Sequence, residues 1–482
     1  MKQRWLVGLC DIPILGWMFV GLLLYFPLFH QLGTPVIRLF DESRLVKNAT
    51  EMLASGNLLV VTFDGKPDLW STKPPLLIWF QALFIAIFGR HDWVVRLPSV
   101  LSALATCWAV SCAIKAHFTN IWWRVLGVLV LVTMPGFLFF HAVRYAEYDA
   151  LLTCCTTWAG VTWWRYVSGE GRKYLFRAVG WLIAGVLAKS VAALLFLPTM
   201  FVALLLHFRV RKTDAIWWFA VVFVFVLIVG GYYAAREWAN SGYLAAVLVN
   251  DIGGRFGTAL DGHTAEFSYY FWQLWHSEMG VWAWVLVLFF PLGFFFSTTR
   301  QRLFLLYVVG MMVSFGLIIS AAQTKLAWYN LPLFPWLAIC VVVGLQAILR
   351  LSTKAAWVGI SGIFLCVAFA YIPVVQRVST PKELPEDAVF YDLAYFLKGC
   401  QVGKFDPNGL RIIYPTYRPN IDWYVETLQK NSTDIKYIGF HEVQIGMKVV
   451  TARPQERDII ADRFQTKTLY QNGLVSVVLI VD

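Results

Sequence analysis

The stretch STKPPLLIWFQALFIAIFGRHDW, residues 71–93, decides how this chain is organised, because its apolar run either crosses a membrane or lies along the surface of one. The run from Pro74 to Gly89 has 16 residues, bracketed by Lys73 and Arg90. As a helix it would rise about 24 Å, less than the roughly 30 Å of hydrocarbon in a bilayer. Prolines at its start suit a first helical turn, where the missing N–H groups have no partner. The pattern therefore predicts a helix at the membrane surface.

The composition of the chain is that of a membrane protein. Of its 482 residues, 59% are hydrophobic and 14% are charged, whereas about 25% are charged in an average soluble domain. The first apolar run follows Lys2 and Arg4 and precedes no small-residue cleavage site, which predicts a retained helix. If residues 74–89 do not span, eleven spanning helices are expected, at residues 14–32, 97–114, 122–141, 148–165, 174–188, 190–207, 214–235, 277–297, 303–322, 330–349 and 355–376.

The distribution of charge favours this arrangement. The net charge is +11, but residues 380–482 contain 12 Lys and Arg against 13 Asp and Glu, so the basic excess lies among the predicted membrane helices. With eleven spans, the short loops that would face the cytoplasm carry the basic clusters, as the positive-inside rule requires. A crossing at residues 74–89 would move every later cluster to the opposite side. The excess charge therefore indicates orientation, and a nucleic-acid partner is not expected.

Two acidic sites are expected on the outer face. Asp41 and Glu42 follow the first span in RLFDESRLVKNATEMLASG, at the start of a second surface helix. A purely structural role is equally open for this pair, because acidic residues at a helix N-terminus interact favourably with the helix dipole. Arg144, Glu147 and Asp149 lie between the third and fourth spans. Ionisable groups so close to hydrocarbon are costly unless they face a cavity or a partner; a structural pairing of Arg144 with Glu147 or Asp149 is the alternative.

Cations are expected on the same face. The segment SAAQTKLAWYNLPLFP places Lys325 and Tyr329 one helical turn apart at the outer end of a span, although such residues can also be interfacial anchors. Lys73 and Arg255 are predicted to face the same side. Cations and carboxylates together suit transfer of a sugar from a polyprenyl phosphate. The leaving phosphate needs cations to neutralise its charge, and the acceptor hydroxyl needs a carboxylate to take its proton.

Several segments resemble those of a known superfamily. DESRLVKNATEMLASGN, KPPLLIWFQALFIAIFG and RLPSVLSALAT are similar to the front half of the membrane glycosyltransferases of the aminoarabinose-transferase and protein O-mannosyltransferase superfamily. YAEYDALLT, GHTAEFSYYF and TKLAWYNLPLFPWLAI resemble its later motifs in the same order, up to about residue 350. The resemblance implies a polytopic α-helical membrane protein of the GT-C type, with about eleven spanning helices, two interfacial helices and a small C-terminal α/β domain.

The residue patterns and the resemblance together predict a site. Its members are the catalytic residues Asp41, Glu42 and Asp149, the phosphate ligands Lys73, Arg255, Lys325 and Tyr329, and the donor or acceptor contacts Arg144, Glu147 and His263. By resemblance, Asp41 matches the general base. The residue before the Lys-Pro-Pro run is often Glu in the aminoarabinose transferases, where it helps to bind a metal with a His, but here it is Thr72. No metal and no other cofactor are therefore predicted.

The C-terminal part of the sequence predicts a separate extracytoplasmic domain over residues 379–482, after a transmembrane domain over residues 1–378. LRIIY, IKYIGF, MKVVTA and VSVVLIV are typical of strands, and NIDWYVETLQ and ERDIIADRF are typical of helices, an alternation that favours a layered α/β fold. The eight cysteines show no disulfide framework or metal-ligand spacing. The sequence contains no Gly-rich phosphate loop, which argues against a nucleotide-sugar donor.

The expected function is transfer of a sugar, with inversion, from a polyprenyl-phosphate-linked donor to a hydroxyl or phosphate of an acceptor. The acceptor is a lipid A-like glycolipid, a cell-surface glycan or a protein. The expected location is a bacterial inner membrane, with the site on the periplasmic face. A secondary transporter is the main alternative, although the paired repeats and broken midplane helices typical of transporters are not evident. A non-catalytic subunit that binds the lipid carrier is the other alternative.

Overall fold

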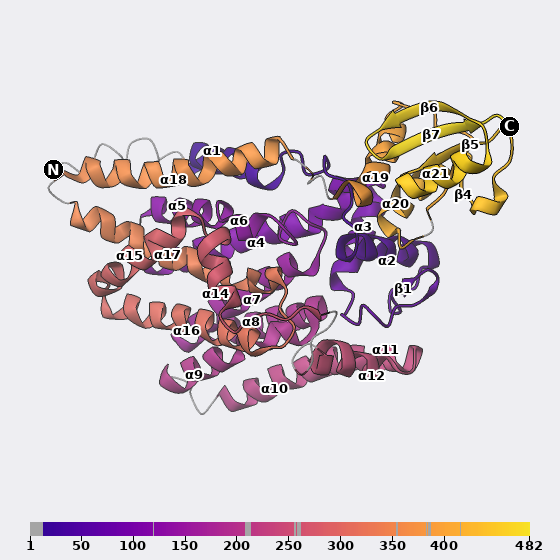
Figure 1. The fold of residues 1–482 in the computed structure, drawn as a ribbon. Helices are drawn as coiled ribbons and strands as arrows, with labels where there is room; N and C mark the ends of the chain where they lie inside the picture. Colours follow the sequence, from indigo (N-terminus) through magenta and orange to yellow (C-terminus); the bar gives the residue numbers. More distant parts are fainter. Residues whose placement is uncertain are drawn as a thin grey trace. The chain divides into compact units, whose positions relative to one another are not determined.

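The structure is a computed structural model that describes residues 13–118, 120–207, 214–254, 257, 262–352, 355–381, 383, 387–414 and 416–482 (Figure 1). The chain divides into two compact units. The first unit consists of Met1–His30, Asn57–Phe80 and Arg96–Ser379, and the second consists of Gln31–Gly56, Gln81–Val95 and Thr380–Asp482. The C-terminal region therefore shares a unit with two segments from the start of the chain, while the domain boundary after residue 378 stays a prediction.

The first unit is built almost entirely from helices. Each of the eleven ranges predicted to span coincides with helical structure. The helical elements that lie wholly or mainly in this unit are α1 (Pro13–Leu28), α4 (Asp92–His117), α5 (Ile121–Val132), α6 (Pro135–Leu138), α7 (Tyr148–Val167), α8 (Lys173–Lys189), η1 (Ser190–Leu194), α9 (Leu197–His207), α10 (Ala215–Phe225), η3 (Val226–Gly230), α11 (Gly231–Ala239), α12 (Tyr243–Val247), η4 (Leu248–Gly253), α14 (Tyr269–Gln273), η6 (Leu274–Glu278), α15 (Val281–Phe296), α16 (Thr299–Ala321), η7 (Ala327–Leu333), α17 (Phe334–Leu351) and α18 (Ala356–Ser379).

The lengths and surfaces of these helices are those of a multi-pass membrane protein. Within the described residues, six helical stretches are long and apolar enough to cross a bilayer, or seven if Tyr269–Glu278 and Val281–Phe296, bent by 111°, count as one span. In the apolar 18-residue window of each stretch, 6% of the residues are buried in Ala215–Ala239 and 17% in Ala356–Ser379. Apolar surfaces of this extent require a membrane or a partner to cover them. Whether all eleven predicted ranges cross the bilayer stays a prediction.

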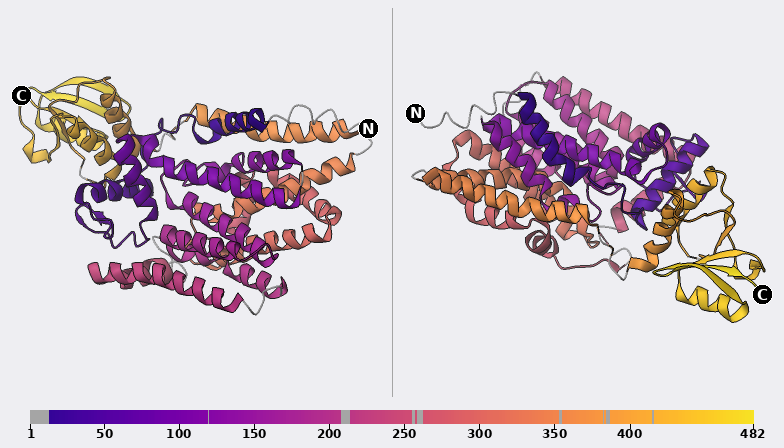
Figure 2. Two further views of the ribbon diagram at one scale, coloured as in Figure 1. Left: turned by 180° about the vertical axis from the view of Figure 1, so that it is seen from behind. Right: turned by 90° about the horizontal axis from the view of Figure 1, so that it is seen from above.

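One helix forms the centre of the first unit. In the apolar 18-residue window of Ala327–Leu351, which includes α17, 89% of the residues are buried. It is surrounded by α5, α15, α16 and α18, all of which contact α17. At the side of the unit, α1 and α18 lie next to each other in both views of Figure 2, and the Tyr371 hydroxyl donates a hydrogen bond to the Leu23 carbonyl oxygen at 2.8 Å.

The apolar run of residues 74–89 contains the helix α3 (Leu76–Phe88), with 13 residues. A helix of that length rises about 20 Å, too short to cross the hydrocarbon of a bilayer. Before it, the chain makes a two-stranded hairpin from β1 (Thr62–Phe63) and β2 (Lys66–Pro67). Both turn residues, Asp64 and Gly65, have positive φ, as a type I′ turn requires. The length of α3 agrees with a surface helix, and its position at the membrane surface stays a prediction.

The second unit contains the predicted α/β domain. Its mixed sheet has the strand order β4-β3-β5-β7-β6, with β3 parallel to β4 and β5, and with β7 antiparallel to β5 and β6. The four predicted strands and two predicted helices are confirmed, whereas α19 and β6 were not predicted. The elements are α2 (Asp41–Ser55), α19 (Ala388–Gln401), β3 (Leu410–Ile412), α20 (Pro419–Lys430), β4 (Ile435–Tyr437), η10 (Phe440–Glu442), β5 (Lys448–Thr451), α21 (Pro454–Arg463), β6 (Thr466–Asn472) and β7 (Val475–Ile480).

A buried carboxylate joins the three segments of the second unit. Asp92 accepts hydrogen bonds from the Lys398 ammonium at 2.6 Å, and from the Trp423 indole and the Tyr424 hydroxyl at 2.9 Å each. The Tyr424 hydroxyl in turn accepts the backbone N–H of Ile37 at 3.0 Å. Charge-assisted hydrogen bonds of this kind are among the strongest in proteins. Together with the packing of α2 on α20, they explain why residues 31–56 belong with the C-terminal domain.

Candidate active site

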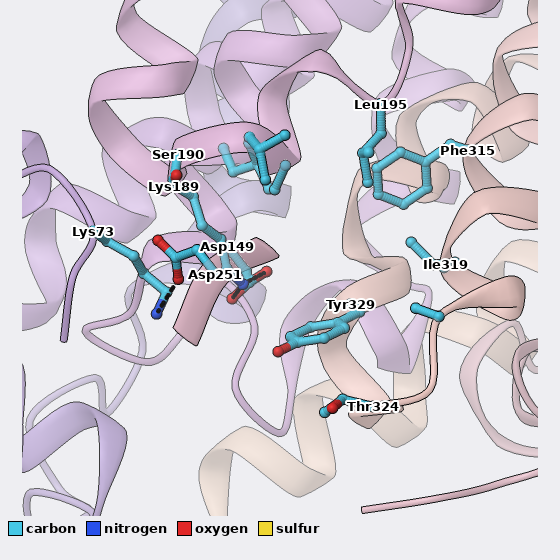
Figure 3. Close-up of a pocket in the computed structure, with 14 residues that line it drawn as sticks. Lys73, Asp149, Lys189, Ser190, Leu195, Asp251, Phe315, Ile319, Thr324 and Tyr329 are labelled. Atoms are coloured by element: carbon cyan, nitrogen blue, oxygen red, sulfur yellow. Dashed lines mark hydrogen bonds and ion pairs between the residues drawn. The ribbon is translucent and has the colours of Figure 1, made fainter. Parts of the chain in front are cut away.

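The first unit contains a pocket with two different walls. Figure 3 shows the charged side chains of Lys73, Asp149, Lys189 and Asp251 gathered at one side, with Leu195, Phe315 and Ile319 at the other. The described residues that line it are Lys73, Asp149, Leu152, Lys189, Ser190, Val191, Ala192, Leu195, Asp251, Phe315, Ile319, Ala322, Thr324 and Tyr329. A pocket with one ionic wall and one apolar wall suits an amphiphile that carries a charged headgroup.

The strongest interaction in the pocket is a buried ion pair that the sequence did not predict. The Lys189 ammonium donates to both carboxylate oxygens of Asp149, at 2.5 and 2.6 Å. The ammonium also lies 4.9 Å from the ring centroid of Tyr329, close enough for a cation–π interaction. Asp149 is 3% exposed and Lys189 is 8% exposed. Removing either charge would leave the other buried without compensation, so the pair is an integral part of this wall.

The backbone beside Lys189 is strained. Lys189 is the last residue of α8, and Ser190 follows it with φ 51° and ψ −140°, a conformation that residues with a side chain rarely adopt. Such a residue costs about 1–3 kcal/mol and persists only where its surroundings enforce it. Here the hydroxyls of Ser190 and Tyr233 lie 3.1 Å apart, and the chain continues into η1. The break in the helix sets the direction of Lys189 and Ser190, both of which line the pocket.

A second cation that lines the pocket is Lys73, the first residue of the Lys-Pro-Pro run. Its ammonium lies 3.9 Å from a carboxylate oxygen of Asp251 and 5.7 Å from the ring centroid of Tyr148. The carbonyl oxygen of the preceding residue, Thr72, accepts a hydrogen bond from the Tyr243 hydroxyl at 2.6 Å. Neighbouring helices therefore hold the backbone next to Lys73 in place.

The structure brings together only part of the predicted site. Lys73, Asp149 and Tyr329 line one pocket. Lys325 does not line it: its ammonium donates to the Ala322 carbonyl oxygen at 2.7 Å, and its backbone N–H donates to the carbonyl oxygen of His263 at 3.0 Å. The side chain of His263 is exposed. Arg255 lies outside the described residues.

The remaining predicted residues of the first unit hold the loop before α7. Arg144 donates to the carbonyl oxygens of Pro27 and His30 at 2.9 and 2.8 Å, so the alternative in which it pairs with Glu147 or Asp149 is wrong. The hydrogen-bond capacity of the guanidinium is used at the end of the first helix, where carbonyl groups lack helical partners. Glu147 lies 2.7 Å from the Nδ1 atom of His141. Neither Arg144 nor Glu147 lines the pocket.

The acidic pair at the start of α2 lies in the second unit and divides into two different environments. Glu42 is fully buried and accepts the backbone N–H of Arg38 at 2.8 Å, a local contact at the helix N-terminus. Asp41, the first residue of the helix, is exposed. The preceding residue, Phe40, has φ 72° and is itself exposed. Of the two carboxylates, Asp41 is therefore the one that solvent and a substrate can reach.

Comparison with solved structures defines the class of this fold. The crystal structure of ArnT from Cupriavidus metallidurans bound to undecaprenyl phosphate superimposes with a TM-score of 0.69, at 14% identity, over 97% of this chain and 98% of that one. The Archaeoglobus fulgidus oligosaccharyltransferase gives a TM-score of 0.53 at 11% identity, over 87% of this chain and 61% of that one. The predicted GT-C fold is thereby confirmed.

Comparison of sequences gives the same superfamily. Residues 72–233 match the family of dolichyl-phosphate-mannose-protein mannosyltransferases. An undecaprenyl phosphate-α-4-amino-4-deoxy-L-arabinose arabinosyl transferase from Shewanella sediminis is 25% identical over 69% of this chain and 60% of its own length. The corresponding transferase of Edwardsiella ictaluri is 28% identical over 38% of this chain and 34% of its own length. The matches thus span between a third and three fifths of the length of these relatives. They confirm the predicted relationship to the aminoarabinose-transferase and protein mannosyltransferase superfamily.

Proposed function

We propose that this protein transfers a sugar from a polyprenyl-phosphate donor to an acceptor outside the cytoplasm. The observation that carries the proposal is the pocket, where the ammonium groups of Lys73 and Lys189 and the apolar side chains of Leu195, Phe315 and Ile319 form opposite walls. A polyprenyl phosphate has an anion for the first wall and a hydrocarbon chain for the second. The relationship to transferases whose names include undecaprenyl phosphate supports this choice of donor.

The reaction is a single displacement at the anomeric carbon. A carboxylate, for which we propose Asp41, takes the proton of the acceptor hydroxyl as its oxygen attacks that carbon. The bond between the anomeric carbon and the phosphate oxygen breaks, and its electron pair stays on the phosphate. The products are the inverted glycoside, a protonated carboxylate and polyprenyl phosphate. Lysine ammonium groups stabilise the charge that develops on the leaving oxygen, so no general acid is needed.

The assay that tests the proposal measures release of free polyprenyl phosphate by the purified protein. The donors are polyprenyl-phosphate sugars, and the acceptors are lipid A-like glycolipids, glycans and peptides. Acceptor-dependent release supports a transferase. Donor binding without release in the presence of any of these acceptors would favour a non-catalytic lipid-carrier subunit. Uptake of a solute into proteoliposomes without binding of polyprenyl phosphate would favour a transporter.

The two lysines predicted to bind phosphate should differ in importance. Lys73→Ala should weaken donor binding about tenfold or more, because a charge-assisted contact to phosphate contributes about 1.5–3 kcal/mol. Lys325→Ala should have a smaller effect, since the Lys325 ammonium donates to the Ala322 carbonyl oxygen and does not line the pocket. Titration of both variants with a polyprenyl phosphate checks this order. Equal losses would place Lys325 at the phosphate, and unchanged affinity in both would remove the site from this pocket.

We further propose that the pocket opens to the periplasmic side of a bacterial inner membrane. If α3 lies on the outer surface, cysteines at the exposed positions Lys66 and Lys404 should both react with a membrane-impermeant maleimide added to intact spheroplasts. These positions avoid the neighbouring Gly65 and Gly403, whose positive φ would strain any side chain. The control is the parent protein, which measures labelling of its own cysteines. Reaction at only one position would contradict the eleven-helix topology.

A further inference from the structure

Among the described residues, the ionic wall of the pocket contains as many carboxylates as cations. The described residues that line it include two lysines, Lys73 and Lys189, and two aspartates, Asp149 and Asp251. Asp251, which comes from η4, is 5% exposed, and one of its oxygens lies 3.9 Å from the Lys73 ammonium. Figure 3 shows this pair at the edge of the charged wall. A carboxylate beside a lysine that binds phosphate lowers the affinity for phosphate. We therefore expect the Asp251 carboxylate to have a function of its own in this pocket.

Two neutral hydrogen bonds hold the segment of Asp251 against the residues that precede the Lys-Pro-Pro run. The neighbouring Asn250 donates a hydrogen bond from its amide to the Leu69 carbonyl oxygen at 2.9 Å. The Tyr243 hydroxyl, from α12, donates to the Thr72 carbonyl oxygen at 2.6 Å. These two hydrogen bonds attach the segment to both ends of residues 69–72, and neither involves a charged group. The Asp251 carboxylate adds a negative charge to the ionic wall of the pocket.

The chemistry of the proposed reaction gives this charge a role. The donor is a phosphodiester with one negative charge, whereas the product is a phosphate monoester with a second pKa near 6 and a charge of about −1.5 to −2 at pH 7. A wall of lysines alone would attract the product more strongly than the donor, because the Coulomb energy is proportional to the charge. The enzyme would then be inhibited by its own product, and product release limits the turnover of many enzymes.

We propose that Asp251 discriminates between donor and product by opposing the second negative charge of polyprenyl phosphate. The proposal rests on the proposed function, since it assigns the monoester as a product. While the phosphate is esterified to the sugar, its single negative charge lies near the ammonium groups of Lys73 and Lys189 and is only weakly opposed by Asp251. Once the bond to the anomeric carbon has broken, the extra charge on the phosphate is repelled by the carboxylate. Asp251 thereby promotes release of the lipid carrier.

The test compares binding of two probes to the full-length protein in detergent. The probes are farnesyl phosphate, a monoester, and its methyl phosphodiester, which carries only one charge. Asp251→Asn should increase the affinity for the monoester about tenfold and for the diester only about threefold, so that the ratio of the two affinities rises. Asp251→Glu retains the charge and should behave like the parent. Asp434→Asn removes an exposed carboxylate of the C-terminal sheet and is the matched control.

A tighter complex is the opposite of what disruption of a structural contact would give. Asp251→Ser is a second charge-removing variant, should Asp251→Asn fail to fold. Adding Lys73→Gln to Asp251→Asn should abolish the gain, because the gain requires an unneutralised ammonium. Weaker monoester binding, or an equal change for both probes, would overturn the role of Asp251 while leaving the proposed function standing. If the parent protein binds neither probe, the proposed function and this inference both fail.

Discussion

Replacing Asp41 with asparagine should lower the rate of sugar transfer about 10²–10⁴-fold, the typical cost of losing general-base assistance. Asparagine keeps the size of the side chain and removes its basicity. Asp41 is the exposed member of the acidic pair and the first residue of α2. Binding of polyprenyl phosphate should change far less, because the cations that we propose as phosphate ligands lie elsewhere. The rate is measured as single-turnover release of polyprenyl phosphate, and the affinity by titration.

The neighbouring carboxylate provides the control for this prediction. Glu42 is buried and accepts the backbone N–H of Arg38 at 2.8 Å. Glu42→Gln retains an oxygen that can accept this hydrogen bond, so the variant should fold and keep most of the rate. The assignment would be wrong if Asp41→Asn retained near-normal turnover while Asp149→Asn or Glu147→Gln abolished it. The base would then belong to the segment that precedes and begins α7.

The helices of the first unit could be predicted because their apolar runs are long and their boundaries carry charge. The positions at which helices break within those runs could not be predicted from the sequence. Residues 122–141 were predicted as one helix, but α5 ends at Val132 and α6 starts at Pro135. A proline within a run ends or kinks a helix, and which of the two occurs depends on the packing around it. Composition alone also does not distinguish a helix that crosses the bilayer from a shorter apolar helix packed inside the unit.

The pocket could be predicted only where its residues lie in recognisable motifs. Lys73 and Tyr329 were found in this way. Lys189 was not, although it is the one Asp, Glu, Lys or Arg between Arg177 and Arg209, and a lone charge in an apolar run is a signal of function. The predicted helix ranges place Lys189 at a boundary between two helices, and the structure confirms this boundary. At the boundary, the strained residue Ser190 directs the chain so that both residues line the pocket. Asp251 lies in a segment predicted as a loop, and no sequence motif indicated that it belongs to the site.

The association of the C-terminal domain with α2 illustrates a different limit. Long-range contacts such as those of Asp92 with Lys398 and Tyr424 join residues more than 300 positions apart, and no local pattern encodes them. Ala49, Met52 and Leu53 of α2 are apolar and have helical spacing, but only Ala49 and Met52 are buried, whereas Leu53 is 41% exposed. The spacing of apolar residues indicates which side of a helix is buried, whereas the width of the buried side depends on the element that packs against it.

The largest effect on stability is expected from the ion pair between Asp149 and Lys189. Lys189→Met keeps much of the apolar volume of the side chain and removes its charge. The Asp149 carboxylate, 3% exposed, would then be buried without its partner. Breaking a buried ion pair on one side costs about 3–5 kcal/mol, so the unfolding temperature of the variant in detergent should fall markedly, and donor binding should be lost.

The double variant separates the role of the pair in folding from its role in function. Lys189→Met with Asp149→Asn removes both charges, and replacing a whole buried pair by neutral groups is often close to neutral for stability. The double variant should therefore reverse most of the decrease in unfolding temperature that Lys189→Met causes. Its asparagine should still accept or donate hydrogen bonds in the ionic wall. Sugar transfer should stay at the level of the single variant, because the Lys189 ammonium, which we propose to stabilise the leaving phosphate, is missing. Recovery of turnover together with stability would show that the pair only supports the fold, and that Lys73 alone provides the cation that the reaction needs.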